Sequence, residues 1–335
     1  MVVVKTLNFR TMRMKLHKVV MKKQAHKHLF GIFLALTGAI LWGIDGITSQ
    51  FLFQRTPVEL SWLIGVKMII SGILLLAVAF AVNGKKIFSV WHSQKGITTL
   101  LIYTIFGLAG DQVAFAMAVK VSSAAMATIL QSLSVILVVI YAAVVYHEFP
   151  NGMRWLAIVI ATLGTWLLVT RGSLNHISLD GPTIFWGLTF AVCAALNNAL
   201  PVRLVASYGS LPIMAWAMLL GGIIFEGIHP VWVNAPHITW DSLLGISFTS
   251  IAGTGLAYYI FISSLKYISP TEATVLITFE ALTAVVGGFL FMGLVLNWAE
   301  ILGAVMILTA TIVLALADRP TTDNGFSKES RSSSE

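Results

Sequence analysis

The stretch Lys266–Leu316, KYISPTEATVLITFEALTAVVGGFLFMGLVLNWAEILGAVMILTATIVLAL, is matched without a gap by the earlier stretch Lys120–Thr170. A shift of 146 positions superimposes the two, and 11 of the 51 aligned pairs are identical. The shared register includes the break between apolar segments at Asn151 and Asn297. A match of this length without gaps indicates a duplicated structural unit, and this unit decides the architecture of the chain.

The composition excludes a soluble protein. Of the 335 residues, 57% are hydrophobic and only 10% are charged, whereas soluble domains carry about 25% charged residues. The basic pI does not indicate nucleic-acid binding, because the basic residues gather at the N-terminus, in short connections and in the tail, as expected for one side of a bilayer. Cys193 is the single cysteine, so no intrachain disulfide can form.

Ten apolar stretches are each long enough to cross the hydrocarbon core of a bilayer, which requires about 20 residues. They are Leu29–Leu52, Leu60–Val82, Ile97–Val119, Ser122–Tyr146, Met153–Thr170, Gly181–Leu204, Leu211–Ile228, Asp241–Leu265, Thr271–Met292 and Asn297–Ala317. The connections between them are short and rich in Gly, Pro and Asn. The sequence therefore predicts an all-α integral membrane protein with ten transmembrane helices and no extramembrane domain.

The duplication divides these helices into two repeats of five, residues 29–170 and 181–317. Because five is odd, the second repeat must cross the membrane in the opposite sense to the first. Inverted repeats are typical of transporters, which hold the substrate near the midplane where the halves meet. A duplication kept only for packing, or a channel, would use the same symmetry. Residues 318–335 are rich in serine and are predicted to form a disordered tail.

The basic residues predict the orientation. Residues 1–28 carry eight Lys and Arg and no long apolar stretch, so this segment is predicted to be a disordered cytoplasmic arm, unless Met14 or Met21 is the true start. With the arm inside, 17 basic residues fall in cytoplasmic segments and three (Arg55, Lys120 and Arg171) in outer loops. Both termini are therefore predicted to be cytoplasmic, in a multi-pass protein of the cell membrane.

Several residues carry a resemblance to a known family. The segment Leu265–Ala273, LKYISPTEA, followed by Phe279-Glu280 and a glycine-rich helix, resembles the second repeat of drug/metabolite transporters of the EamA type. His147-Glu148 is similar to the acidic end of helix four in their first repeat. The chain departs from the family at Ala281, where proline is common, and at Leu294, where an acid is common. The resemblance implies ten helices, inverted halves, a central cavity and transport of small solutes.

Three ionisable residues are predicted to lie at one depth inside the membrane. Asp45, Lys67 and Asp111 fall about 10 Å below the outer surface at a rise of 1.5 Å per residue. Ionisable groups in hydrocarbon are costly, so these residues predict a buried cluster that binds a coupling proton or a cationic amine. The alternative is a static pair of Asp45 with Lys67 that leaves Asp111 near the aqueous rim.

A second polar group is predicted near the midplane, in the duplicated stretch itself. Thr128, Gln131 and Ser132 share one face of helix four, and Glu280 and Thr283 share one face of helix nine. We predict that these two faces form the wall of a substrate-binding cavity. For Glu280 the alternative is a hydrogen bond to a neighbouring helix.

Further polar and aromatic residues are candidates for solute contact. Pro201 should kink helix six just after Asn198, and Tyr258 lies at a similar depth in helix eight. Asn198 and Tyr258 are thus predicted to form an inner gate or to contact the solute, with hydrogen bonding between helices as the alternative. Trp42 and Trp186, each followed by glycine in its own repeat, are predicted to line the cavity.

The sequence thus predicts a secondary transporter of a small metabolite such as an amino acid, an amine or a nucleobase. We expect an exporter that works by alternating access, driven by a solute gradient or by proton exchange. No P-loop and no His-Glu-x-x-His motif occurs, and we expect no catalytic residue, metal, cofactor or nucleic-acid partner. The expected partners are the solute and membrane lipid. The alternatives are a membrane-embedded enzyme that modifies lipids and a passive channel.

Overall fold

The computed structural model describes residues 7–56, 58–134, 136–137, 152–173, 179–233, 235–236, 238–268 and 270–317. Its side chains are described in the same ranges except at 7–25, 270–272, 274 and 315–317. Within these ranges the regular structure is entirely helical. The α-helices are α1 (Leu7–Arg55), α2 (Leu60–Asn83), α3 (Gln94–Ile102), α4 (Gly110–Val121), α5 (Ala124–Gln131), α7 (Gly152–Thr170), α8 (Gly181–Ala199), α9 (Val202–Tyr208), α10 (Ser210–Ile228), α11 (Trp240–Ser247), α12 (Ala257–Ser264), α13 (Pro270–Phe291) and α14 (Trp298–Ala317). A 3-10 helix, η1 (Gly84–His92), and two π-helices, η2 (Tyr103–Ala109) and η3 (Phe248–Leu256), complete the elements.

The helices have the length and composition of membrane spans. Seven helical stretches of the described chain are long and apolar enough to cross a bilayer, and shorter apolar helices cover Val275–Phe291 and Trp298–Leu314. The predicted fourth span begins as α5, and its second half lies outside the described residues. His147 and Glu148 also lie outside them. The protein is an all-helical integral membrane protein, as the sequence predicts.

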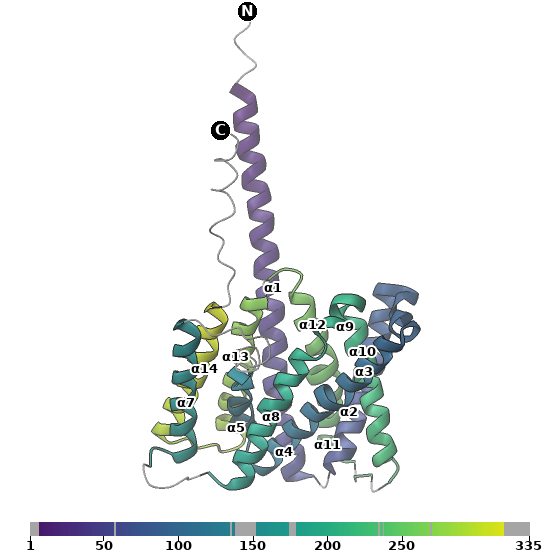
Figure 1. Ribbon diagram of the computed structural model, residues 1–335, viewed down its shortest axis with the longest axis vertical. Coiled ribbons are helices and arrows are strands. Elements are labelled where there is room, and N and C mark those ends of the chain that lie inside the picture. Colours follow the sequence, from purple (N-terminus) through teal and green to yellow (C-terminus); the bar gives the residue numbers. More distant parts are fainter. Residues whose placement is uncertain are drawn as a thin grey trace, which may run out of the picture.

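The packing of the helices shows the internal symmetry (Figure 1). Helix α2 packs against α10, and α7 packs against α14, so equivalent helices of the two halves face each other. Helix α1 packs against η3, α12 and α13 of the second half, whereas α8 packs against η2, α4 and α5 of the first half. Helix α1 and the α8–α9 pair run in opposite directions through the bundle. This is the arrangement of two inverted repeats.

The two π-helices occupy equivalent places in the repeats. The shift of 146 positions that relates the duplicated stretches carries Gly107 of η2 onto Gly253 of η3. A π-helix widens the turn and leaves backbone carbonyls free for other partners. The Ser71 hydroxyl of α2 donates a hydrogen bond of 2.7 Å to the Ser250 carbonyl of η3. Both halves therefore interrupt their third helix at the same level.

Small residues allow the equivalent helices to approach closely. A Cβ atom at Gly164 of α7 would lie 2.8 Å from the Gly303 carbonyl oxygen of α14, and one at Gly303 would lie 2.6 Å from the Gly164 carbonyl oxygen. At Gly72 of α2, a Cβ atom would lie 2.5 Å from the backbone nitrogen of Leu219. Such contacts between backbones replace the hydrophobic driving force that is absent between helices in lipid.

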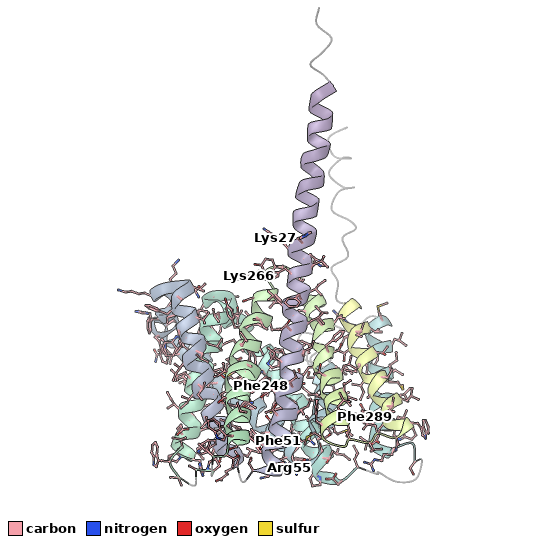
Figure 2. All side chains as sticks on the ribbon, turned by 180° about the vertical axis from the view of Figure 1, so that it is seen from behind. Lys27, Phe51, Arg55, Phe248, Lys266 and Phe289 are labelled. Atoms are coloured by element: carbon pink, nitrogen blue, oxygen red, sulfur yellow. The ribbon has the colours of Figure 1, made fainter. Side chains whose placement is uncertain are left out.

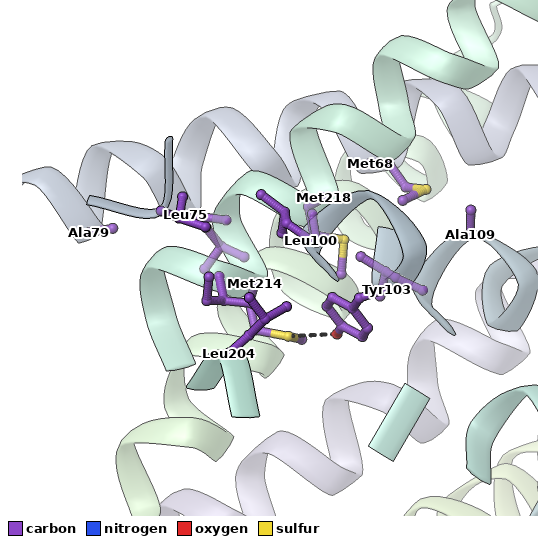
Figure 3. Packing of buried hydrophobic residues seen from close by; sticks show 14 of the residues in the cluster. Met68, Leu75, Ala79, Leu100, Tyr103, Ala109, Leu204, Met214 and Met218 are labelled. Atoms are coloured by element: carbon purple, nitrogen blue, oxygen red, sulfur yellow. Dashed lines mark hydrogen bonds between the residues drawn. The ribbon is translucent and has the colours of Figure 1, made fainter. Parts of the chain in front are cut away.

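The largest buried cluster lies between α2, the α3–η2 helix and α10 (Figure 3). Met68, Tyr103 and Met218 are fully or almost fully buried in it. The Tyr103 hydroxyl donates a hydrogen bond to Met214 Sδ at 3.1 Å, which gives this buried hydroxyl a partner.

Helix α1 differs from the prediction at its N-terminal end. The sequence predicts a disordered arm before Leu29, but the backbone is helical from Leu7 onward and projects beyond the bundle (Figure 1). No glycine or proline occurs between Leu7 and Lys27. The helix is therefore not interrupted by either of the residues that most often break one.

The second half begins with a well-capped helix. The Asp180 carboxylate accepts a hydrogen bond from the backbone N–H of Thr183 at 3.2 Å, and Pro182 stands in the first turn of α8. The helix then ends at Ala199, and α9 starts at Val202 after Pro201. The predicted break at Pro201 is therefore present.

Candidate functional site

A cavity of about 590 Å³ lies among helices of both repeats. Its polar and aromatic lining from the first repeat comprises Trp42, Asp45, Lys67, Tyr103, Asp111, Gln112, Phe115, Gln131, Ser132 and Ser134. Its corresponding lining from the second repeat comprises Phe190, Asn197, Asn198, Ser210, Thr254, Tyr258, Phe261, Thr278, Glu280 and Thr311. A cavity of this volume has the size of a site for a small molecule.

Asp45 and Lys67 form a buried ion pair in the cavity wall. Lys67 Nζ of α2 lies 3.4 Å from Asp45 Oδ2 of α1, and the side chains are only 5% and 7% exposed, respectively. The Lys67 ammonium also lies 5.4 Å from the centre of the Phe115 ring, within the range of a cation–π interaction. Both sequence-based alternatives include this contact, and the common depth of the two residues in the membrane stays a prediction.

The Asp45 side chain packs against the π-helix η3. A Cβ atom at Gly253 would lie 2.6 Å from Asp45 Oδ1, so only glycine leaves room for the carboxylate. Asp45 Oδ1 is buried and has no hydrogen-bond partner among the described residues. The contact therefore joins the ion pair of the first repeat to the interrupted helix of the second.

Asp111 has its hydrogen-bond partner in the second repeat. The sequence predicts a cluster of Asp45, Lys67 and Asp111, and all three line the cavity, where the ion pair of Lys67 in the described chain is with Asp45. The Asn197 side-chain amide of α8 donates a hydrogen bond of 3.4 Å to Asp111 Oδ2. The reason is the packing of α4 against α8, which brings Asp111 to the opposite repeat. At 6% exposure Asp111 is buried and does not lie at an aqueous rim.

Glu280 stands on the cavity wall in α13. It is 8% exposed, and no described residue forms a hydrogen bond or an ion pair with its carboxylate. The alternative of a hydrogen bond to a neighbouring helix thus has no support in the described part of the chain. Helix α1 passes close by at Gly43, where a Cβ atom would lie 2.7 Å from the Glu280 carbonyl oxygen.

Aromatic rings pack against one another at the cavity wall, and the two repeats contribute them from equivalent positions. The Trp42 ring centre lies 4.9 Å from that of Tyr258 and 4.9 Å from that of Phe261. On the other side, the Phe115 and Phe190 ring centres are 5.4 Å apart. The shift of 146 positions carries Phe115 onto Phe261, so each repeat places one such ring against the first helix of the other repeat.

Three of the predicted solute contacts do not line the cavity. The Thr128 and Thr283 hydroxyls donate hydrogen bonds to backbone carbonyls of their own helices, at Ala124 and Phe279. Hydroxyls within helices commonly bond in this way. Trp186 packs beside Phe185 and against the apolar cluster that contains Phe190, and it is not among the residues that line the cavity.

Some lining residues are not among the predicted contacts. One of them, Thr278, could have been predicted from the internal repeat. The shift of 146 positions carries Ser132 onto Thr278, which also lines the cavity. Gln112, the neighbour of Asp111, and Tyr103 line it too. No sequence pattern distinguishes these two from ordinary core residues, because their place on the wall depends on how the third helix is rotated against its neighbours.

The described residues hold no group of three or more His, Cys, Asp or Glu side chains that could bind a metal ion. The chemistry of the wall is instead that of a polar binding site with aromatic rings.

Comparison with known proteins identifies the family. The model of the EamA-like transporter family matches this chain twice, over residues 29–170 and 181–316. The chain belongs to this family. Each match covers five of the predicted spans, so the family unit occurs once in each half.

Known relatives of this EamA-like transporter match either most of the chain or about half of it. The uncharacterized inner membrane transporter YicL of Salmonella typhimurium is 29% identical over 86% of this chain and 96% of its own length. The threonine/homoserine exporter RhtA of the same species is 27% identical over 51% of this chain and 56% of its own length. A solved crystal structure with 16% identity matches at a TM-score of 0.59, over 87% of this chain and 97% of that one, which shows a common fold.

The family makes the protein a multi-pass membrane transporter that handles small solutes, and not an enzyme. The cavity of this EamA-like transporter extends from Asp45 and Lys67 to Val205 and Leu265. Leu265 adjoins Lys266, which lies toward the same end of the bundle as Lys27, whereas Phe51 and Arg55 lie at the opposite end (Figure 2). The cavity therefore reaches furthest toward the end from which α1 projects.

Proposed function

We propose that the protein exports a small metabolite by alternating access, with the solute bound in the cavity between the two repeats. The observation that carries this proposal is the position of the cavity. Its wall takes charged and aromatic residues from both inverted halves, so a relative movement of the halves changes the set of contacts that a bound solute can make. Glu280, Gln131, Ser132, Asn198, Tyr258 and Trp42 are the proposed contacts.

The proposed orientation places both termini in the cytoplasm, together with the end of the bundle toward which the cavity extends. The basic residues support it, with 17 in the predicted cytoplasmic segments and three outside. A cavity open to the cytoplasm would collect solute from within the cell, as an exporter requires. Apolar side chains on the outside of the bundle, such as Phe289 at 69% exposure (Figure 2), would face lipid.

Coupling to protons is the proposed role of one of two buried acids, Asp45 or Asp111. Asp45 and Asp111 have buried oxygens without a partner in the described chain, and such groups can accept a proton when the surroundings change. RhtA, a relative over about half of this chain, is named as an exporter of threonine and homoserine. Amino acids are accordingly among the solutes to test, beside amines and nucleobases.

The orientation can be tested by labelling single cysteines. In a Cys193→Ser background, Lys85→Cys and Lys120→Cys place a thiol on exposed residues at the predicted inner and outer ends. An impermeant maleimide added to intact cells should label Lys120→Cys and should not label Lys85→Cys. Labelling of the two residues from the same side would refute the antiparallel arrangement of the halves.

Transport can be tested in proteoliposomes. We expect saturable uptake of at least one solute from a mixture of amino acids, amines and nucleobases, and its loss or altered specificity in Glu280→Gln at an unchanged protein level. A channel would instead give flux that does not saturate. Full activity of Glu280→Gln would exclude the central cavity as the solute site.

A further inference from the structure

The charges on the cavity wall do not balance. Three carboxylates line it, those of Asp45, Asp111 and Glu280, and Lys67 is the sole base among the described lining residues. Three carboxylates against one ammonium leave a net charge of −2 when all four groups are ionised. Uncompensated charge inside a membrane protein is expensive, so these carboxylates must be neutralised by protons or by a bound cation.

Lys67, the base on the wall, already forms an ion pair. Lys67 Nζ lies 3.4 Å from Asp45 Oδ2, and both side chains are almost completely buried. The ring of Phe115 lies 5.4 Å from the same ammonium. To bind an anionic group of a solute, Lys67 would have to leave Asp45, which would then be a buried carboxylate without its partner.

The two remaining carboxylates form no ion pair with a described residue. Asp111 receives a hydrogen bond at 3.4 Å from the neutral amide of Asn197, and its Oδ1 atom is buried without a partner. Glu280 has neither a hydrogen bond nor an ion pair with a described residue, although it lines the cavity. Asp111 belongs to the first repeat and Glu280 to the second, so the pair spans the seam between them.

The rest of the wall is also suited to a cation. Asn197 Oδ1 and Gln112 Oε1 are buried acceptors without a partner among the described residues. Trp42 and Tyr258 line the cavity with aromatic rings, whose faces attract organic cations. Acceptors, carboxylates and rings together favour a ligand that donates hydrogen bonds and carries positive charge.

We propose that the solute is a small organic cation, a primary amine whose ammonium group is held between Asp111 and Glu280. This inference rests on the proposed transport function and names the class of its substrate. A zwitterionic amino acid fits less well, because its carboxylate finds no free cation at the wall. An organic anion is excluded by the same carboxylates.

The test is a set of ligands that differ in charge but share one ring and a similar chain: phenethylamine, phenylalanine and 3-phenylpropionate. Methylamine and 1,4-diaminobutane extend the set to smaller cations. Binding to the purified full-length protein is measured by calorimetry. We expect at least one amine to bind about tenfold or more tightly than phenylalanine, a difference of about 1.4 kcal/mol, and 3-phenylpropionate not to bind.

Variants locate the site. Asp111→Asn and Glu280→Gln should each weaken binding of the amine about tenfold or more, whereas Asp241→Asn, which removes an exposed acid of α11, should leave the affinity unchanged. The melting temperature of each variant shows whether it is folded. If one variant does not fold, the comparison of amine, zwitterion and anion binding to the unmodified protein still tests the proposal.

Several results would overturn the inference. They are equal or tighter binding of phenylalanine, binding of 3-phenylpropionate, no binding of any amine, or an unchanged affinity in both folded variants. If a zwitterion is transported saturably and this transport is lost in Glu280→Gln, the proposal of a cationic solute is wrong and the transport function is supported. Absence of saturable transport for every solute would instead remove the proposed function itself.

Discussion

Lys67 Nζ lies 3.4 Å from Asp45 Oδ2, and the pair joins α1 to α2 inside the membrane-spanning part of the protein. Lys67→Met alone leaves Asp45 without its partner, so we expect destabilisation of about 3–5 kcal/mol. The measurement is thermal unfolding of the purified protein. The double variant Asp45→Asn/Lys67→Met should regain most of this stability, because neither charge remains.

Transport by that double variant decides the role of the ion pair. Normal transport in the stable double variant would show that the pair is a static link between the helices. A stable protein without transport would support the role of Asp45 in coupling.

The contact between Gly164 and Gly303 predicts a second stability effect. Gly164→Ala puts a Cβ atom 2.8 Å from the Gly303 carbonyl oxygen, so α7 and α14 must separate, with an expected cost of about 1–3 kcal/mol. Gly227→Ala is the matched control, because a Cβ atom there meets nothing within 4 Å. The melting temperature should fall for Gly164→Ala and stay the same or rise for Gly227→Ala. Equal melting temperatures would contradict the close packing of these helices.

The Asp180 cap predicts a dependence on pH. Thr183, through its side chain and its backbone N–H, holds the pKa of Asp180 below its ordinary value. A lowered pKa in the folded state means that the stabilisation is present above the ordinary aspartate pKa and is lost as the pH falls through the lowered value. Asp180→Asn keeps a good cap but cannot titrate. The difference in melting temperature between the two proteins should therefore change only in this acid range.

Removing the cap altogether gives the reference for that experiment. Asp180→Ala should cost about 1 kcal/mol at neutral pH, as N-cap substitutions typically do. A constant difference between the unmodified protein and Asp180→Asn across the acid range would show that the Asp180 charge does not stabilise the helix.

Pro201 separates α8 from α9, and we expect its replacement to slow transport without lowering the thermal stability. Pro201→Ala restores a backbone N–H, so the helix can continue through the position. We expect an equal or higher melting temperature and slower transport, because Asn197 and Asn198 would turn away from their places on the cavity wall. Pro182→Ala, at an exposed first-turn position of α8, serves as the control and should alter neither property. Unchanged transport in Pro201→Ala would mean that the break has no part in the mechanism.

The amino-acid sequence by itself determined the membrane class, the spans and the duplication, because hydrocarbon admits only long apolar helices and the register of Lys120–Thr170 on Lys266–Leu316 leaves no gap. It also predicted contact between Asp45 and Lys67, since the fixed rise of a helix gives the two residues a similar predicted depth. Only the tertiary structure decided that Asp111 bonds to Asn197, that Glu280 has no partner among the described residues, and that Thr128, Thr283 and Trp186 lie away from the cavity. These outcomes depend on how each helix is rotated against its neighbours. The rotation depends on contacts such as Gly253 against Asp45, which join residues far apart in the chain.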